Sequence, residues 1–163
     1  MTLSALMVKE LREKSGAGMM DCKKALLASD GKMDEAIDWL RKQGLSAVQK
    51  KSGRVAAEGL IGITIKNNIG SIVEINSETD FVARNEVFQN FVRTCSQLAL
   101  LTDNVDNLKA QNFPSSERTV EQELNHNISI IGENMNIRRF EILSVKKGVK
   151  NTRDLLGNGV EIG

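Results

Sequence analysis

The residue types that carry out chemistry are sparse in this sequence and stand apart from one another. His126 is the only histidine, and it falls between two asparagines on the polar side of a predicted helix, which favours a surface position. Gly16-Ala17-Gly18 is shorter than a phosphate-binding loop and is not followed by Lys-Ser or Lys-Thr, so it predicts a tight turn between helices. We therefore expect no enzyme, no metal site and no cofactor.

The two cysteines and the charge balance exclude several other functions. Cys22 and Cys95 each lie in a helical pattern and not in a closely spaced pair, which predicts free buried thiols. Twenty-two Lys and Arg against 21 Asp and Glu give a formal charge of +1, so no global field attracts nucleic acid or anionic lipid. Neither a secretion signal nor a membrane-spanning apolar run of about 18 residues is apparent, which predicts a soluble protein of the cytoplasm or of an organelle matrix, and we expect the cytoplasm.

The most unusual stretch is Ser77-Glu-Thr-Asp-Phe-Val-Ala83, which places an acid beside a bulky aromatic residue between a predicted strand and a predicted helix. In one interpretation Phe81 folds back into the core while Asp80 or Thr79 caps nearby amides. In the other, Phe81 is an exposed anchor for a pocket on a partner protein. The residues alone leave both interpretations open.

Met19-Met20 is a second candidate contact site. Consecutive residues on a helix diverge by about 100°, so we expect both side chains not to face the same core and at least one of them to be exposed. An exposed methionine suits adaptable protein contacts, whereas a buried one is ordinary core packing. The basic residues Lys50, Lys51 and Arg54 are expected to form a solvated face.

Three short amphipathic helices in the first fifty residues must position Met19 and Met20. Gly16, Asp30-Gly31 and Gly44 are expected to end them. Their apolar stripes are Leu3, Leu6, Met7 and Leu11; Cys22, Ala25 and Leu26; and Met33, Ala36, Ile37 and Leu40. The small and basic residues from Leu45 to Gly59 then predict a partly helical linker and a domain boundary.

The second half of the chain alternates strand and helix patterns and predicts an α+β core with antiparallel strands. Leu60 to Lys66 is expected to pair with Gly70 to Asn76 as a hairpin around Asn67-Asn68. A helix with Asn85 as N-cap follows, and another is predicted from Ser115 and Ser116 to Gly132. The apolar residues on one face of the helix that follows Asn85 are Phe88, Phe91, Val92, Cys95, Leu98 and Ala99. A last strand is predicted from the apolar residues Ile137, Phe140, Ile142, Leu143 and Val145.

Three motifs, in order, resemble the elongation factor Ts family. The run from Val8 to Leu26, VKELREKSGAGMMDCKKAL, is similar to the opening of that family, and Glu78-Thr-Asp-Phe-Val-Ala83 is similar to its core signature. Ile131-Gly-Glu-Asn-Met-Asn-Ile-Arg-Arg139 supplies the third match. The resemblance covers approximately residues 4 to 147.

This resemblance implies a guanine nucleotide exchange factor for the translational GTPase elongation factor Tu. It implies an amino-terminal three-helix, ubiquitin-associated-like domain at residues 1–50, a linker at 51–59 and a core subdomain at 60–147 that grips the GTP-binding domain. The resemblance also implies a heterodimer or heterotetramer with elongation factor Tu, without direct contact to nucleic acid or membrane.

The family resemblance assigns a role to both candidate contact sites. The residues implied to dislocate Mg²⁺ from the partner GTPase are Thr79, Asp80, Phe81 and Val82. The aromatic residue equivalent to Phe81 enters an apolar pocket beside the switch region, and the neighbouring acid helps to displace the elements that hold Mg²⁺. The residues implied to bind the partner from the amino-terminal domain are Arg12, Met19 and Met20.

The end of the chain departs from the family pattern. Residues 148–163 show no family motif and form a divergent tail where a second core subdomain is expected, so apolar surface that this subdomain covers is expected to be exposed. A binding module without full exchange activity is therefore an alternative. A further alternative is an RNA-binding protein, which the near-neutral charge and the absence of tyrosine disfavour. Its basic contact residues would be Lys50, Lys51, Arg54, Arg138 and Arg139.

Overall fold

The computed structural model describes residues 4–114 and 116–145, and it divides into two units. The first contains the described residues up to Arg54 together with Asn125–Asn134. The second contains Val55–Leu124 and the described residues from Met135 onward. The combination of an amino-terminal group of three helices with three antiparallel strands and their helices confirms the predicted α+β class. The predicted boundaries at 50 and 60 remain predictions, and the tail at 148–163 lies outside the described residues.

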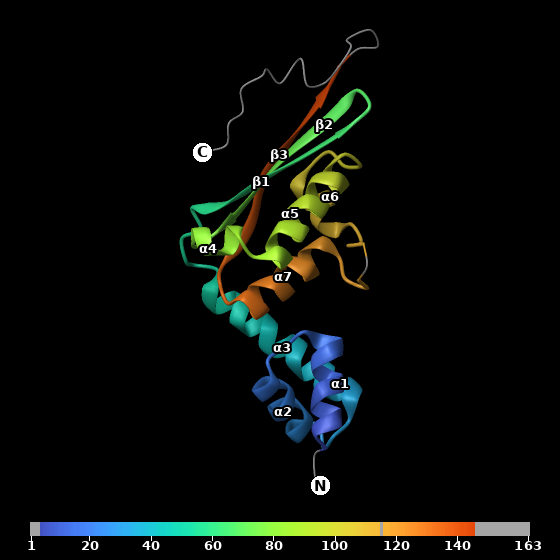
Figure 1. The fold of residues 1–163 in the computed structure, drawn as a ribbon, viewed down its shortest axis with the longest axis vertical. Coiled ribbons are helices and arrows are strands. Elements are labelled where there is room, and N and C mark those ends of the chain that lie inside the picture. Colours follow the sequence, from blue (N-terminus) through green and yellow to red (C-terminus); the bar gives the residue numbers. More distant parts are fainter. Residues whose placement is uncertain (1–3, 115, 146–163) are drawn as a thin grey trace. The chain divides into compact units, whose positions relative to one another are not determined.

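The first unit is built on three helices, α1 (Ala5–Ser15), α2 (Met19–Ala28) and α3 (Met33–Lys51) (Figure 1). Gly16 ends α1 in the left-handed conformation, with φ 68°, and its N–H donates to the carbonyl of Arg12. This confirms the predicted stop, because glycine adopts that conformation without a steric penalty. The fully buried core residues shared by the three helices are Leu11, Cys22, Ala25, Leu26 and Ala36.

Two details of the predicted helices are wrong. Leu6 was expected in the buried stripe of the first helix but is 77% exposed, because Met7, Val8 and Leu11 form the face that packs on the core. Gly44 does not end α3, which continues to Lys51. A glycine inside a helix costs only about 1 kcal/mol, and a Cβ at Gly44 would approach the Ser129 hydroxyl to 3.3 Å, so the missing side chain permits close packing.

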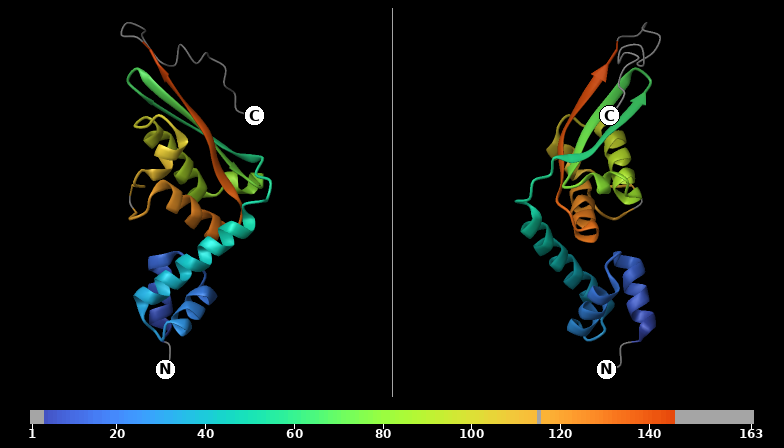
Figure 2. Two further views of the ribbon diagram at one scale, coloured as in Figure 1. Left: turned by 180° about the vertical axis from the view of Figure 1, so that it is seen from behind. Right: turned by 60° about the vertical axis from the view of Figure 1, so that its left-hand side comes forward.

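The second unit contains a sheet of three antiparallel strands in the order β1 (Glu58–Lys66), β2 (Ile69–Ser77) and β3 (Met135–Ser144) (Figure 2). Lys66 pairs with Ile69, so Asn67 and Asn68 form the predicted two-residue turn. Asn67 has a φ of 55°, a conformation that asparagine tolerates better than most residues. The hairpin and the last strand are therefore confirmed.

One face of the sheet packs on α5 (Glu86–Ala99) through small residues and hydroxyl groups. A Cβ at Gly62 would lie only 2.8 Å from the Val92 carbonyl oxygen, so β1 approaches the helix more closely than any other residue type would allow. The Thr64 and Ser96 hydroxyls are 2.6 Å apart. The exposed large apolar residues on the other face are Ile61, Ile63, Ile65 and Leu143.

The described residues of the second half also form α4 (Asp80–Ala83), α6 (Val105–Ala110) and α7 (Val120–Ile131). The sequence did not predict α4 or α6, which are four and six residues long. Ser116 does not start α7, and Ser115 lies outside the described residues. The start is a capping box instead, in which Thr119 Oγ1 accepts from the Gln122 N–H and Gln122 Oε1 accepts from the Thr119 N–H.

The structure bears on two predictions, that the cysteines are free and buried and that no helix spans a membrane. Cys22 and Cys95 are both buried and free, as predicted. Burial raises the pKa of the Cys95 thiol, which keeps it protonated and unreactive. Within the described part of the chain, no helix combines the length and the apolar character that crossing a membrane requires.

Candidate functional site

The stretch that follows β2 folds into a short turn that buries one of two adjacent apolar residues and exposes the other. Val82 is 4% exposed and belongs to the core, whereas Phe81 is 75% exposed. Both belong to α4, where consecutive side chains point in directions about 100° apart, so one of them can pack into the core while the other faces solvent. The structure thus supports the interpretation of Phe81 as an exposed aromatic side chain and not the one that places it in the core.

Hydrogen bonds fix this turn to the sheet before it and to the helix after it. On the sheet side, the hydroxyl of buried Ser77 donates to the Thr79 carbonyl at 3.0 Å. Within the turn, the N–H of Arg84 donates to the Phe81 carbonyl at 3.1 Å, and the N–H of Asn85 donates to the Val82 carbonyl at 2.9 Å. Phe81 therefore projects from a backbone with defined geometry.

The polar members of the predicted site differ in exposure. Thr79 is the half-buried N-cap residue of α4, and its backbone is extended with φ −126°. Asp80 is exposed and occupies the first turn of α4, where a carboxylate interacts favourably with the free N–H groups of the helix start. An exposed acid beside an exposed aromatic side chain is a combination that a partner protein can recognise in one contact.

The other predicted contact residues lie in the first unit. Met19 and Met20 occupy the first turn of α2 and are 60% and 64% exposed. At least one exposed methionine was expected, and both are exposed because Cys22 and Ala17 fill the core at this end of the helix. Arg12 is also exposed, in the last turn of α1. The fold thus brings Thr79–Val82 into one turn and places Arg12 with the two methionines in the first three helices.

Other polar features of the described residues do not form a reaction centre. No group of three or more His, Cys, Asp or Glu that could hold a metal ion occurs among the residues that the structure describes. The single histidine, His126, is half-buried, and a Cβ at Gly16 would approach its Nε2 to 3.2 Å. It therefore packs on a turn while keeping part of its surface exposed, which agrees with the surface position that the sequence favoured.

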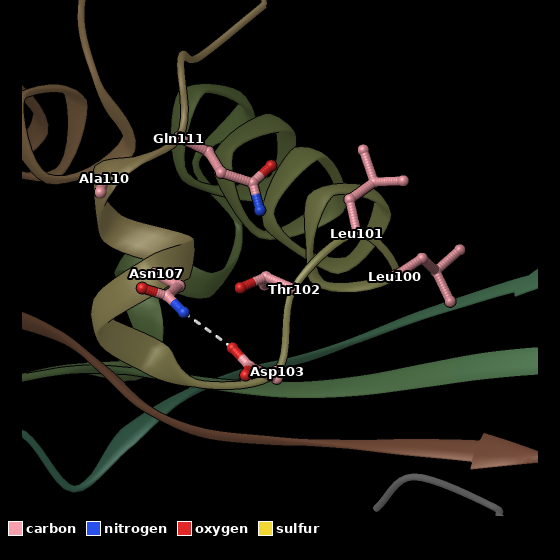
Figure 3. Close-up of a pocket in the computed structure, with 7 residues that line it drawn as sticks. All are labelled: Leu100, Leu101, Thr102, Asp103, Asn107, Ala110 and Gln111. Atoms are coloured by element: carbon pink, nitrogen blue, oxygen red, sulfur yellow. Dashed lines mark hydrogen bonds between the residues drawn. The ribbon is translucent and has the colours of Figure 1, made fainter.

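A hollow lies where the end of α5 meets α6 (Figure 3). Its polar groups are used to hold the local structure, because the Asn107 amide donates to the Asp103 carboxylate at 2.8 Å and Gln111 donates to the Leu98 carbonyl at 3.3 Å. The neighbouring Asn104 side chain accepts from the Asn107 N–H as the N-cap of α6. These contacts cap the start of α6 and join its end to α5, and nothing in the hollow resembles a catalytic arrangement.

The basic residues considered for RNA binding are partly committed to an ion pair. Arg139 Nε lies 2.7 Å from Glu74 Oε2, and an Arg138 terminal nitrogen lies 3.7 Å from Glu74 Oε1. The hydrogen bond from Arg139, assisted by one from Asn76, holds the pKa of the Glu74 carboxyl below its usual range. The pairing lowers the net positive charge available on β3 for a phosphate backbone.

Comparison with known proteins shows a similarity to one family. Residues 78–152 match the family model described as "Elongation factor TS". The chain is 60% identical to an elongation factor Ts of Rhodospirillum centenum over 151 residues, which are 92% of this chain and 49% of that protein. It is 52% identical to an elongation factor Ts of Sinorhizobium fredii over 163 residues, which are 98% of this chain and 53% of the relative.

These matches confirm the resemblance that the three motifs indicated. An elongation factor Ts of Bartonella quintana is 56% identical over 153 residues, which are 93% of this chain and 50% of the relative. The chain therefore spans about half the length of the curated relatives it matches. Over this part the sequence is similar to elongation factor Ts, and the activity of the whole relatives is a proposal for this chain.

Proposed function

We propose that this chain, a homologue of elongation factor Ts that spans about half the length of its curated relatives, binds elongation factor Tu and promotes the release of GDP. It would act as an exchange factor and not as an enzyme. The observation that carries the proposal is Phe81, which is 75% exposed on a hydrogen-bonded turn beside an exposed acid. Large exposed aromatic side chains are the residues that dominate binding energy at protein interfaces.

The proposed mechanism uses binding energy and not bond chemistry. Phe81 would enter an apolar pocket of the GTPase and act as a wedge, while Asp80 would displace elements that hold the Mg²⁺ of the partner. Because Mg²⁺ requires near-octahedral oxygen coordination at short distances, a small movement of its ligands removes much of its contribution to nucleotide affinity. GDP would then dissociate faster.

The same coupling explains how the factor is released. A protein that binds the nucleotide-free GTPase tightly lowers the affinity of that GTPase for nucleotide. By thermodynamic reciprocity, the arrival of GTP lowers the affinity for the factor by the same ratio. The exchange factor would therefore be recovered unchanged after each cycle.

The first unit would supply a second contact. Arg12, Met19 and Met20 are exposed on α1 and α2, and methionine side chains adapt well to an apolar partner surface. We propose that the complex forms in the cytoplasm, with a heterodimer or heterotetramer as its stoichiometry. Analytical ultracentrifugation of the mixed proteins would distinguish the two assemblies and would refute both if the chains sedimented separately.

The decisive experiment is the release of a fluorescent GDP analogue from elongation factor Tu, chased with excess unlabelled nucleotide, with and without this chain. We expect a release rate that rises with the concentration of the chain and saturates. The rise should be smaller at high Mg²⁺ concentration, because excess metal opposes its displacement. A release rate unaffected by the chain at every concentration would refute exchange activity.

A binding module without exchange activity is the second candidate, and the half-length match to the relatives favours it. Such a module would associate with elongation factor Tu and leave the nucleotide in place. Calorimetric titration into GDP-bound elongation factor Tu, measured beside the release assay, separates the two candidates. Binding without faster release would identify the module. If the chain neither binds elongation factor Tu nor speeds GDP release, both proposals are refuted.

A further inference from the structure

The turn that carries Phe81 is too short to hold its own shape. The helix α4 contains four residues, and the first turn of a helix fixes several backbone dihedral angles for a single hydrogen bond. Since Phe81 is 75% exposed, packing of its own ring contributes little to this geometry. Contacts from outside the turn must therefore keep the anchor in place.

One of these contacts comes from the side chain of Gln89, six residues beyond the turn. Its Nε2 donates to the carbonyl of Ala83, the last residue of α4, at 2.9 Å. The carbonyls of Phe81 and Val82 accept from backbone N–H groups. The Gln89 bond therefore extends the series of satisfied carbonyl groups to the end of the turn.

Gln89 reaches the turn from a firmly anchored helix. The side chain of Asn85 caps α5 by accepting from the N–H groups of Val87 and Phe88, at 2.9 and 3.3 Å. Phe88, one residue before Gln89, is fully buried in the core. A short turn is thus fastened by a side chain whose own backbone is fixed, which is the arrangement that preorganises a contact residue.

We propose that Gln89 is a positioning residue, which holds the Asp80–Ala83 turn so that Phe81 is presented to the partner in its binding geometry. The proposal rests on the proposed contact between Phe81 and elongation factor Tu. Gln89 acts through the backbone of the turn and not by touching the GTPase. Without its hydrogen bond, the turn samples other conformations, and binding must select the competent one.

The first test is a double-mutant cycle on the affinity for GDP-bound elongation factor Tu. Gln89→Met keeps the side-chain length and the helix propensity but removes the donor, so we expect affinity to fall about fivefold, the scale of one hydrogen bond. In a Phe81→Ala background the same substitution should change affinity less than about twofold, because the anchor it positions is gone. Gln89→Lys restores a nitrogen donor and should recover most of the loss.

Gln97→Met is the matched control, since Gln97 is exposed two turns later on the same helix, and its affinity should equal that of the parent. An unchanged affinity of Gln89→Met would overturn the proposal. An equal loss with and without Phe81 would also overturn it, because Gln89 would then contact the partner directly.

The second test needs no partner and separates this proposal from the proposed function. Hydrogen exchange of the Arg84 and Asn85 amides, which bond to the turn carbonyls, should accelerate about fivefold or more in Gln89→Met, while the Cys95 amide in α5 keeps its parental rate. Unchanged exchange at both amides would refute the positioning role. If Phe81→Ala alone leaves the affinity unaltered, the contact itself is wrong, and amide exchange still decides whether Gln89 holds the turn.

Discussion

At the scale of single residues, the two phenylalanines on either side of Asn85 perform different tasks. Phe81 is 75% exposed and Phe88 is fully buried, although both belong to short apolar patterns in the sequence. Exposure of a large aromatic ring lowers solubility. An exposed Phe81 on a fixed turn is therefore consistent with a binding role. The difference in burial permits a direct comparison of the two side chains.

We expect Phe81→Ala to change the free energy of unfolding by less than about 0.5 kcal/mol and to lower the promoted rate of GDP release from elongation factor Tu more than tenfold. Phe88→Ala, the buried control, should cost about 3 to 5 kcal/mol of stability. Thermal unfolding and GDP release measured side by side test both statements. An unfolding midpoint of Phe81→Ala as low as that of Phe88→Ala would contradict the anchor assignment, as would parental GDP release.

A second residue-scale prediction concerns Gly59 at the start of β1. Its φ is 137°, and a Cβ there would overlap the carbonyl oxygen of Ile75 on the paired strand. Gly59→Ala should therefore lower the free energy of unfolding by more than about 2 kcal/mol. Gly53→Ala is the control, because a Cβ at Gly53 meets nothing within 4 Å, and it should stay within about 0.5 kcal/mol of the parent. Denaturant titration resolves this difference, and equal midpoints would show that the strand relaxes.

At the scale of elements, the β2–β3 ladder is joined by a charged cross-strand pair as well as by backbone hydrogen bonds. Glu74 lies opposite Arg139 in the register, and Asn76 donates a further hydrogen bond to the same carboxylate at 3.2 Å. The side chain of Glu74 is 18% exposed and that of Arg139 is 72% exposed, so solvent screens the pair. The pair contributes a modest, pH-dependent part of the stability of this edge.

The pKa of Glu74 is lower in the folded protein than in the unfolded chain, mainly because of the hydrogen bond from Arg139. Its contribution is therefore fully present above the unfolded pKa and is lost as the pH falls through the folded pKa. We expect stability to fall more steeply from about pH 5 to pH 3 in the parent than in Glu74→Gln, by up to about 1 kcal/mol. Glu141→Gln, an exposed neighbour on β3, should keep the parental slope in urea titrations, and identical slopes for all three proteins would refute the assignment.

At the scale of the whole molecule, the chain consists of two units with separate cores. The first three helices close around Leu11 and its neighbours, and the sheet with α5 closes around residues such as Val73 and Phe88. A compact unit with its own apolar core can fold alone when the buried area is sufficient. The predicted domain at residues 1–50 remains to be tested on this basis.

We expect a fragment of residues 1–54 to show helical circular dichroism and a cooperative thermal transition. Leu11→Ala should abolish the transition, because removing a fully buried leucine costs about 2 to 5 kcal/mol, which is as much as a small bundle has. Leu6→Ala should leave it in place, since Leu6 is 77% exposed. A fragment without dispersed amide signals would show that the helices depend on the rest of the chain.

The sequence by itself determined the elements whose local signals agree with one another. The Asn67-Asn68 turn set the hairpin register, Asn85 capped α5, and Gly16 stopped α1, because each of these residues has an intrinsic preference that the tertiary structure does not oppose. The three motifs also indicated the resemblance to elongation factor Ts, which the relatives of Rhodospirillum centenum and Sinorhizobium fredii confirm with 60% and 52% identity.

Only the tertiary structure decided the helix lengths and side-chain exposures that depend on a neighbour distant in sequence. Gly44 carries an ordinary helix-stop signal, but close packing on Ser129 keeps α3 continuous through it. The sequence also left open whether Phe81 is buried, and the choice follows from Val82 occupying the core while Ser77 and Gln89 fix the turn. The hydrogen bond from Gln89 to Ala83 leaves no pattern in the sequence, because a glutamine on the same helix, Gln97, is simply exposed. Burial and side-chain reach are properties of the assembled fold, and local propensity therefore cannot specify them.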